Sequence, residues 1–228
     1  MKIAFVSSIY PKHRDHIYKK RRDLSKKSYK EQQLIIEEET ICSMGMWTHQ
    51  FMREGHEAIM ICRNNIIHQN KWCEENGFTP KSEDYEFEIV KEQLIRFKPE
   101  ILFIFGASYY AQKKRLVNLS YSIKSLKKKF CWYGAPEGEN KIFKDYDLVF
   151  TNSVHLRQVL NESGLNAQQI DHAFEPSINS KLSETRKKKI ITFIGTVNKE
   201  LDSHKKRTEI LEKLICSIPI NVYTSLEN

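Results

Sequence analysis

The sequence predicts an α/β protein with a Rossmann-like parallel sheet covered by helices on both faces, followed by an incomplete second Rossmann-like domain. Two observations carry this prediction. Short, uninterrupted apolar runs recur along the 228-residue chain, and amphipathic segments separate many of them. Strands that alternate with helices of ten or more residues are joined by right-handed crossovers, which make the strands parallel and cover both faces of the sheet.

The first half of the chain opens with a buried strand. Residues 2–7 form a compact apolar run that ends in a Ser-Ser pair and is soon followed by a proline. The next helix is predicted to begin late, to be interrupted near Gly45 and to end at Gly55. The predicted elements of this half are strand 2–7, helix 31–53, strand 58–62 and helix 84–97.

The second half repeats the alternation. Gly106 and Gly134 end two apolar strands, and Asn152 and Ser153 are good N-caps for a helix that Gly164 ends. The predicted elements here are strand 101–105, a helix through Leu116, Leu119, Ile123 and Leu126, strand 130–133, strand 148–150 and helix 154–162. Together with the first half they give one parallel sheet.

A polar segment then interrupts the pattern. Residues 173–189 contain a proline and a basic run, as interdomain linkers do, so we predict an N-terminal domain over 1–172 and the start of a C-terminal domain over 190–228. The C-terminal part is predicted as strand 190–195, helix 205–216 and strand 220–223. One βαβ unit cannot bury both faces of its strands, so this domain is expected to be incomplete, or its strands extend the first sheet or a partner's sheet.

Composition places the chain among globular proteins, with 40% hydrophobic and 29% charged residues. The five cysteines are scattered and form no C-x-x-C pair, so we read them as reduced core thiols of a cytosolic protein. The opening apolar run is too short for a signal peptide, and no stretch is long enough to span a membrane. We therefore expect a cytoplasmic location, with peripheral contact at the inner membrane face left open.

The formal charge of +8 is concentrated in residues 12–30, where nine Lys or Arg face two Asp. Such a run is most often a solvated surface, but it also fits contact with an anionic membrane or with a phosphorylated substrate. No zinc-finger spacing, RNP-type strand or G-x-x-G loop accompanies the charge, so nucleic acid is not expected as a partner.

In open parallel sheets, ligands bind outside the carboxyl ends of the strands. The sequence places polar or small residues at these ends: Ser7, Ser8, Tyr10, Gly106, Ala107, Ser108, 133–137, Asn152, Ser153 and 195–198. The alternative explanation is that these residues only form tight turns. There is no dinucleotide fingerprint, Walker A loop, zinc-protease motif or serine-hydrolase elbow. These classes of enzyme lose their usual sequence support.

The segment FIGTVNKELDSHKKRTEILEKL is the most informative one for chemistry. A strand ends at Gly195, and a loop leads to His204, Lys205, Lys206 and Arg207 at the predicted start of a helix. Free backbone N–H groups and nearby cations at a helix start favour a diphosphate group. The alternative is a basic, solvated helix start.

Order and spacing of several segments resemble bacterial GT-B glycosyltransferases of the CgeB-like or glycosyltransferase family 1/4-like kind. The segments are MKIAFVSSIYPK, YKKRRDLSKKSYKEQ, SMGMWTHQFMREGHEA, NKWCEENG, IRFKPEILFI, YDLVFTNSVH, HAFEPSI, FIGTVN and HKKRTEILEKL. No single segment is highly specific. The resemblance extends over nearly the whole chain, to about residue 225, and YGAPEG at 133–138 departs from the family pattern.

The resemblance implies roles for named residues. It assigns Gly45 and Trp47 to the acceptor cleft, where the strand ends already place Ser8, Tyr10, Gly106 and Ser108. It also assigns the donor diphosphate site to Gly195, His204, Lys205 and Arg207, and the hinge to Glu175 and Pro176. Trp47 fits a core aromatic equally well, and Glu175 fits a surface acid. His13, His16 and His49 are candidates for a general base.

The implied activity is glycosyl transfer from a nucleotide-diphosphate sugar to an unknown glycan, lipid-linked or protein acceptor, without a metal ion or cofactor. Proteins of this family continue well beyond the present length. We therefore expect a truncated or split form, inactive alone or dependent on a partner chain that supplies the missing C-terminal half. The alternative is a non-enzymatic α/β binding protein whose basic arm, 12–30, docks on an anionic membrane surface.

Overall fold

The computed structural model describes residues 1–39, 44–105, 115–134, 140–171, 179, 190–195, 197 and 202–224, with side chains excluded at 44, 45, 140, 141 and 202–204. The chain divides into two compact units, Met1–Ile178 and Asn179–Asn228.

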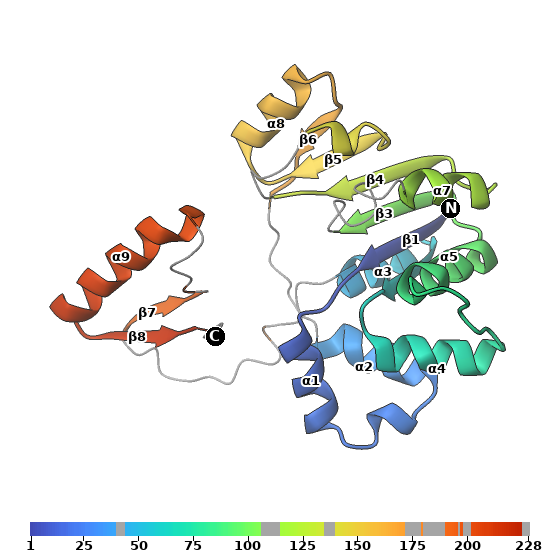
Figure 1. Cartoon of the computed structure of the whole chain (residues 1–228), viewed down its shortest axis with the longest axis horizontal. Helices are drawn as coiled ribbons and strands as arrows, with labels where there is room; N and C mark the ends of the chain where they lie inside the picture. The colour runs from blue at the N-terminus through green and yellow to red at the C-terminus, as the bar shows by residue number, and fades with distance from the viewer. Residues whose placement is uncertain are drawn as a thin grey trace. The chain divides into compact units, whose positions relative to one another are not determined.

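The first unit is built on a parallel sheet (Figure 1). Among the described residues, six strands form it in the order β2-β1-β3-β4-β5-β6. Every neighbouring pair is parallel. The strands are β1 (Lys2–Ser7), β2 (Glu57–Cys62), β3 (Ile101–Phe105), β4 (Lys128–Trp132), β5 (Leu148–Thr151) and β6 (Ala167–Gln169). This arrangement confirms the predicted Rossmann-like α/β fold.

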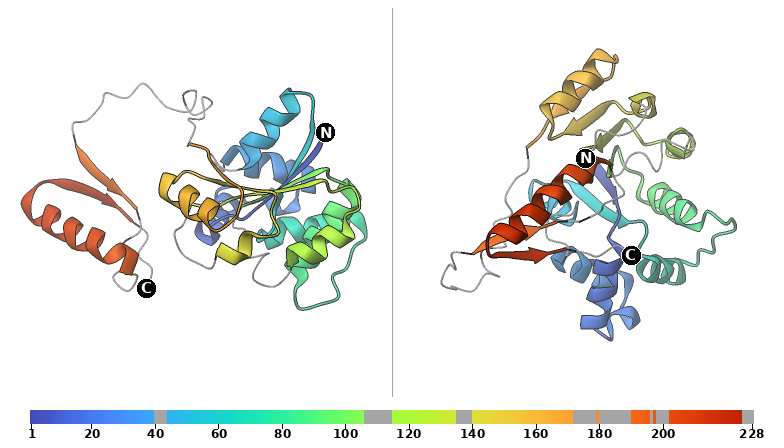
Figure 2. Two further views of the ribbon diagram at one scale, coloured as in Figure 1. Left: turned by 90° about the horizontal axis from the view of Figure 1, so that it is seen from above. Right: turned by 60° about the vertical axis from the view of Figure 1, so that its left-hand side comes forward.

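Helices connect the strands and cover both faces of the sheet, as Figure 2 shows in its view from above. They are α1 (Pro11–Lys20), α2 (Tyr29–Glu39), α3 (Met44–Arg53), α4 (Ile66–Asn76), α5 (Tyr85–Phe97), α7 (Arg115–Ser122) and α8 (Val154–Glu162), with short 3-10 turns η1 (Leu24–Lys26) and η2 (Asn140–Phe143). No helix in the described part of the chain is both long and apolar enough to cross a membrane.

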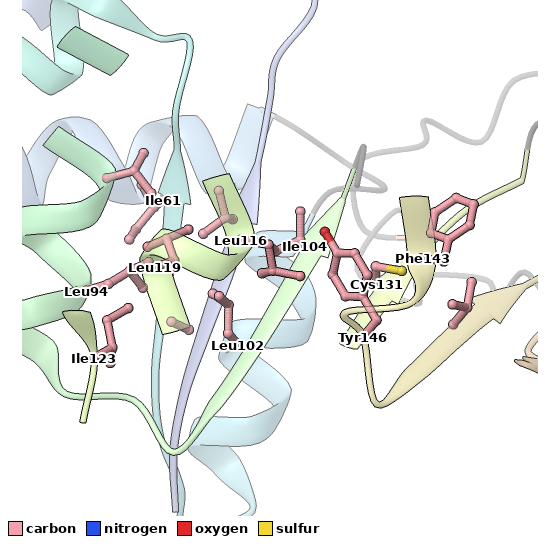
Figure 3. Close-up of a cluster of buried hydrophobic side chains, with 14 of the residues drawn as sticks. Ile61, Leu94, Leu102, Ile104, Leu116, Leu119, Ile123, Cys131, Phe143 and Tyr146 are labelled. Carbon is pink, nitrogen blue, oxygen red and sulfur yellow. The ribbon is translucent and has the colours of Figure 1, made fainter. Parts of the chain in front are cut away.

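One face of the sheet packs against α5, α7 and α8. Leu102 and Ile104 of β3 are fully buried there and meet Leu94 of α5 and Leu119 of α7 in one apolar cluster (Figure 3). Side chains of a strand alternate between faces, so residues two apart in β3 share this cluster. Burying each such side chain stabilises the fold by roughly 1.5–3 kcal/mol.

The opposite face is aromatic. Phe5 of β1 and Phe103 of β3 lie 5.7 Å apart between ring centroids, and Trp47 of α3 meets Phe103 edge-on at 5.4 Å. Phe51, one turn further along α3, packs on Phe5 at 5.6 Å. These contacts fix α3 against β1 and β3.

The connections create a topological switch point between β1 and β3. From β1 the chain moves to the edge strand β2, and from β2 it crosses back past β1 to β3. Consequently α3 covers the Phe5 face of the sheet, whereas α7 covers the Leu102 face. In such folds the ligand crevice lies beyond the carboxyl ends of the two strands at the switch point.

The helix predicted over 31–53 is α2 and α3, with residues 40–43 outside the described part. Gly55 has φ +82°, and Gly164 has φ +78°, so both glycines act as the helix stops predicted for them. The helix predicted to run through Leu126 ends at Ser122. Helices α1 and α4 and strand β6 were not predicted.

The second unit contains strand β7 (Ile191–Ile194), helix α9 (Asp202–Ser217) and strand β8 (Ile220–Tyr223). β7 pairs with β8 in a parallel two-stranded sheet of its own. Thr208 and Leu211 of α9 are buried, whereas Ile194 of β7 is 80% exposed and Tyr223 of β8 is 61% exposed. Further strands or helices on this unit would bury that apolar surface, whichever chain supplies them.

Candidate functional site

The carboxyl end of β1 presents Ser8 and Tyr10 to solvent, and Tyr10 is 83% exposed. Between them, Ile9 is buried and its main chain is held by the Asn64 side chain. The Ile9 N–H donates to Asn64 Oδ1 at 2.8 Å, and Asn64 Nδ2 donates to the Ile9 carbonyl at 2.8 Å. This two-point contact fastens the loop after β1 to the loop after β2, and it leaves the side chains of Ser8 and Tyr10 outward.

Helix α1 starts directly from this loop. Tyr10 occupies its N-cap position, and Pro11 opens the first turn. The Tyr10 carbonyl accepts from the main-chain N–H groups of His13 and Arg14, at 2.9 and 3.0 Å. The structure therefore places a helix N-terminus beside Ser8, at the switch point.

On the β3 side of the switch point, Gly106 and Ser108 lie outside the described residues. Further along the same edge, Gly134 follows β4, and Asn152 follows β5. A side chain added at Gly134 would come within 3.1 Å of Asn152 Oδ1 and 2.5 Å of the Trp132 ring, so the glycine allows these groups to approach closely. Ser153 caps α8 as predicted, accepting from the Leu156 N–H at 3.2 Å.

Gly45 lies in the first turn of α3, and Trp47 follows it. Trp47 is half-buried and packs edge-on against Phe5, Phe103 and Phe105, at centroid distances of 6.3, 5.4 and 5.7 Å. Its ring thus belongs to the aromatic face of the sheet. The structure brings Trp47 close to the end of β3 through Phe105, the last residue of that strand.

In the second unit, Gly195 ends β7, and its N–H donates to the Tyr223 carbonyl at 3.1 Å. Helix α9 begins at Asp202, three residues before the predicted start. The basic cluster therefore does not form the first turn of the helix, contrary to the prediction. Lys205 and Arg207 are exposed and lie beyond its first three positions, and the side chain of His204 lies outside the described part of the chain. Glu175 and Pro176 lie outside the described residues.

Of the three candidate histidines, His49 has the best-defined partner. Its Nε2 lies 2.5 Å from Oε2 of Glu37, a carboxylate on α2 that is only 7% exposed. Gln33 Nε2 donates to the other oxygen of Glu37 at 2.6 Å. His13 and His16 lie on α1, half-buried and exposed respectively.

The Glu37–His49 pair borders a cavity of about 480 Å³ that the sequence did not reveal. Its walls come from α2, α3, β2, α4 and α5, which are far apart in the chain. Nothing in a linear pattern marks such a cavity, because its lining residues also satisfy the ordinary helical and strand periodicities.

The basic segment over 12–30 is folded. It comprises α1 and η1, which are anchored by the fully buried side chains of Ile17 and Leu24. Lys20 and Arg21 pair with Glu39 on α2 at 3.1 and 3.0 Å. The remaining cations of this segment therefore project from a fixed surface rather than from a loose arm.

The described cysteines of the first unit, Cys62, Cys73 and Cys131, are buried, whereas Cys216 of the second unit is exposed. Burial raises the pKa of the Cys62 thiol to about 12, and burial also raises the pKa of the Cys131 thiol. Both sulfurs are therefore protonated and unreactive at neutral pH. Among the described residues, no group of His, Cys, Asp and Glu side chains is arranged to hold a metal ion.

No protein-family model matches this sequence, and no curated protein matches it.

Proposed function

We propose that the chain carries the acceptor-side unit, and the opening of the nucleotide-sugar unit, of a GT-B glycosyltransferase. The observation that carries the proposal is the order of the two structural units along the chain. A Rossmann-like sheet with a switch point at β1 and β3 is followed by a separate strand–glycine–helix arrangement at Gly195 and α9. The resemblance of the sequence segments to GT-B enzymes supports the same assignment.

The chemistry follows from the proposed roles. In the transfer, the bond between the anomeric carbon and the diphosphate oxygen breaks, and an acceptor oxygen or nitrogen forms the new bond and gives up its proton. Negative charge then develops on the departing diphosphate. The free N–H groups in the first turn of α9 are suited to stabilise this charge, because a helix N-terminus attracts anions. Lys205 and Arg207 follow this turn, and their side chains would reach back toward the same group. Ser8 and Tyr10 would contact the acceptor.

Nucleotide binding tests the donor site. The chain is titrated with UDP, GDP and dTDP, and with their sugar conjugates, by isothermal titration calorimetry. We expect saturable binding of one nucleotide and a loss of about tenfold or more in affinity in Arg207→Ala, because a hydrogen bond to a charged group contributes about 1.5–3 kcal/mol. Lys213→Ala is the matched control, since Lys213 is an exposed cation further along α9. Absence of nucleotide binding, or equal losses in both variants, contradicts the proposal.

A second candidate function rests on the folded basic surface of α1 and η1. Lys19, Arg22 and Lys26 are exposed and have no described carboxylate within ion-pair distance. Each such cation near an anionic bilayer contributes about 1 kcal/mol to binding. Sedimentation with anionic vesicles should therefore carry the chain down at low salt, neutral vesicles should not, and the triple change to glutamate should abolish the difference. Equal sedimentation with both vesicle types rules this candidate out.

A further inference from the structure

The cavity beside β2 opens along the free edge of the sheet. β2 pairs with β1 on one side only among the described strands. In a parallel pair, alternate residues direct their N–H and C=O groups away from the neighbour. Glu57 and Arg63 donate toward β1, so Ala58 and Met60 direct their main-chain groups outward, and both residues line the cavity.

Two buried oxygen atoms in the cavity lining have no hydrogen-bond partner among the described residues, Oε1 of Gln33 and Oε1 of Gln93. The Gln33 amide has a fixed orientation, because its Nε2 donates to Glu37 at 2.6 Å and a reversed amide would place oxygen against oxygen. Gln93 is 4% exposed, and its Nε2 donates to the Tyr29 hydroxyl at 3.3 Å. A buried acceptor without a partner costs about 1–3 kcal/mol, so a donor supplied from outside the chain would recover this free energy.

The rest of the lining is mostly apolar. Met60 and Phe97 form part of the wall, and Trp72 lies beside them. Leu34 and Met52 are 49% and 46% exposed, so apolar surface also reaches solvent at the cavity. The volume of about 480 Å³ falls in the range of small-molecule sites.

We propose that this cavity binds a small apolar molecule with a hydrogen-bond donor at one end, an aliphatic amine or alcohol. The apolar chain would lie against Met60, Trp72 and Phe97. The amide oxygens of Gln33 and Gln93 are fully buried in the free chain, so the donor would meet one of them once that amide turns toward the cavity. A carboxylate at the same place would face these oxygens and Glu37 without offering a proton. This site is independent of the glycosyltransferase assignment.

Two cationic side chains, Arg96 and Lys30, also line the cavity and could favour a ligand with a negative end group. Arg96 is held by Glu92 at 2.8 Å and by the Asn76 carbonyl at 3.1 Å, and its guanidinium lies 5.2 Å from the Trp72 ring centroid. Lys30 is exposed. If these cations governed the site, a carboxylate ligand would bind best, so the order of affinities separates the two possibilities.

The first experiment uses the unaltered chain. 1-Octylamine, 1-octanol and octanoate share one apolar chain and differ only in the end group, and each is titrated by calorimetry with tryptophan fluorescence as a second signal. We expect saturable binding of the amine or the alcohol, at least tenfold tighter than that of octanoate. The amine and alcohol arms identify the kind of donor. No saturable binding, equal affinities, or preference for octanoate would overturn the proposal.

The second experiment separates binding from folding with Gln93→Met. Methionine keeps the length of the side chain and removes the unpartnered oxygen, but it also removes the Nε2 donor to the Tyr29 hydroxyl. The free energy of unfolding of the free chain is therefore measured beside the affinity, and we expect a loss of no more than about 1–3 kcal/mol. The same change should weaken binding of the preferred ligand about tenfold, whereas Gln158→Met, on the exposed surface of α8, should leave it unchanged. Unchanged affinity in Gln93→Met would contradict the assigned role of Gln93.

Discussion

Replacing the buried His68 with glutamine should remove most of the sensitivity of folding to mild acid that this side chain confers. His68 lies on α4 with no exposed surface, and its ring stacks on Tyr29 at 4.0 Å between centroids. Nε2 lies 3.0 Å from the Tyr29 carbonyl oxygen, which requires a donor, so the neutral ring carries its proton on Nε2. Burial disfavours the charged form and lowers the pKa of His68 to about 4.

Proton linkage gives the sign and the size of the change in unfolding free energy with pH. The unfolded chain takes up a proton at this histidine near pH 6.5, whereas the folded chain does so only near pH 4, so the unfolded state binds more protons between these values. The free energy of unfolding must then fall as the pH falls. The two pKa values give a loss of about 2 kcal/mol between pH 7 and pH 5, and about 3 kcal/mol by pH 4.

Urea denaturation at several pH values from 7 to 5 measures this loss. The quantity compared is the change in unfolding free energy with pH, taken as the difference between the unaltered chain and His68→Gln. Glutamine retains an N–H donor for the Tyr29 carbonyl but does not titrate. His155→Gln on the surface of α8 is the control and should leave the pH dependence as it was. Parallel pH curves for the unaltered chain and His68→Gln would refute the reasoning.

Three further predictions concern packing, capping and thiol chemistry. Leu94→Ala in the core should lower the free energy of unfolding by about 2–5 kcal/mol in urea denaturation, because the side chain is fully buried and leaves a cavity; a loss below 1 kcal/mol would show that the site is poorly packed. Ser153→Ala should cost about 1 kcal/mol, since it removes the hydroxyl that accepts from the Leu156 N–H, and Ser153→Asp should restore most of this loss. Iodoacetamide should modify the exposed Cys216 in the native chain and spare Cys131, which peptide mass spectrometry would detect; equal modification would show that the core opens readily.

Much of the first sheet could be predicted because its strands are apolar on both faces. The predicted limits of strand 2–7, helix 154–162 and strand 220–223 coincide with those observed. Helix α1 was not predicted because it buries only Ile17, so its sequence shows no helical repeat of apolar residues. Helix α4 buries the polar side chains His68 and Gln69, which a hydrophobic pattern counts as solvent-facing.

The candidate site was predictable only where it follows directly from a strand end. Ser8 and Tyr10 are placed by β1 itself, so the position of this strand gives theirs. The start of α9 was predicted three residues late, because residues 202–204 are polar and show no apolar period. The cavity beside β2 depends on the packing of helices from separate parts of the sequence, which single-element patterns do not report.

The double contact between Asn64 and Ile9 has a consequence for association at the switch point. The carboxamide pairs with the main chain of Ile9 as a neighbouring strand would, so the loop carrying Ser8 and Tyr10 is already restrained in the free chain. A molecule that reaches this edge therefore does not have to immobilise the loop, and the entropic penalty of its capture is correspondingly smaller. In Asn64→Asp a carboxylate oxygen would face the Ile9 carbonyl in place of the donor. The loop would then be less restrained, and a binding molecule would have to bear the entropic cost of ordering it.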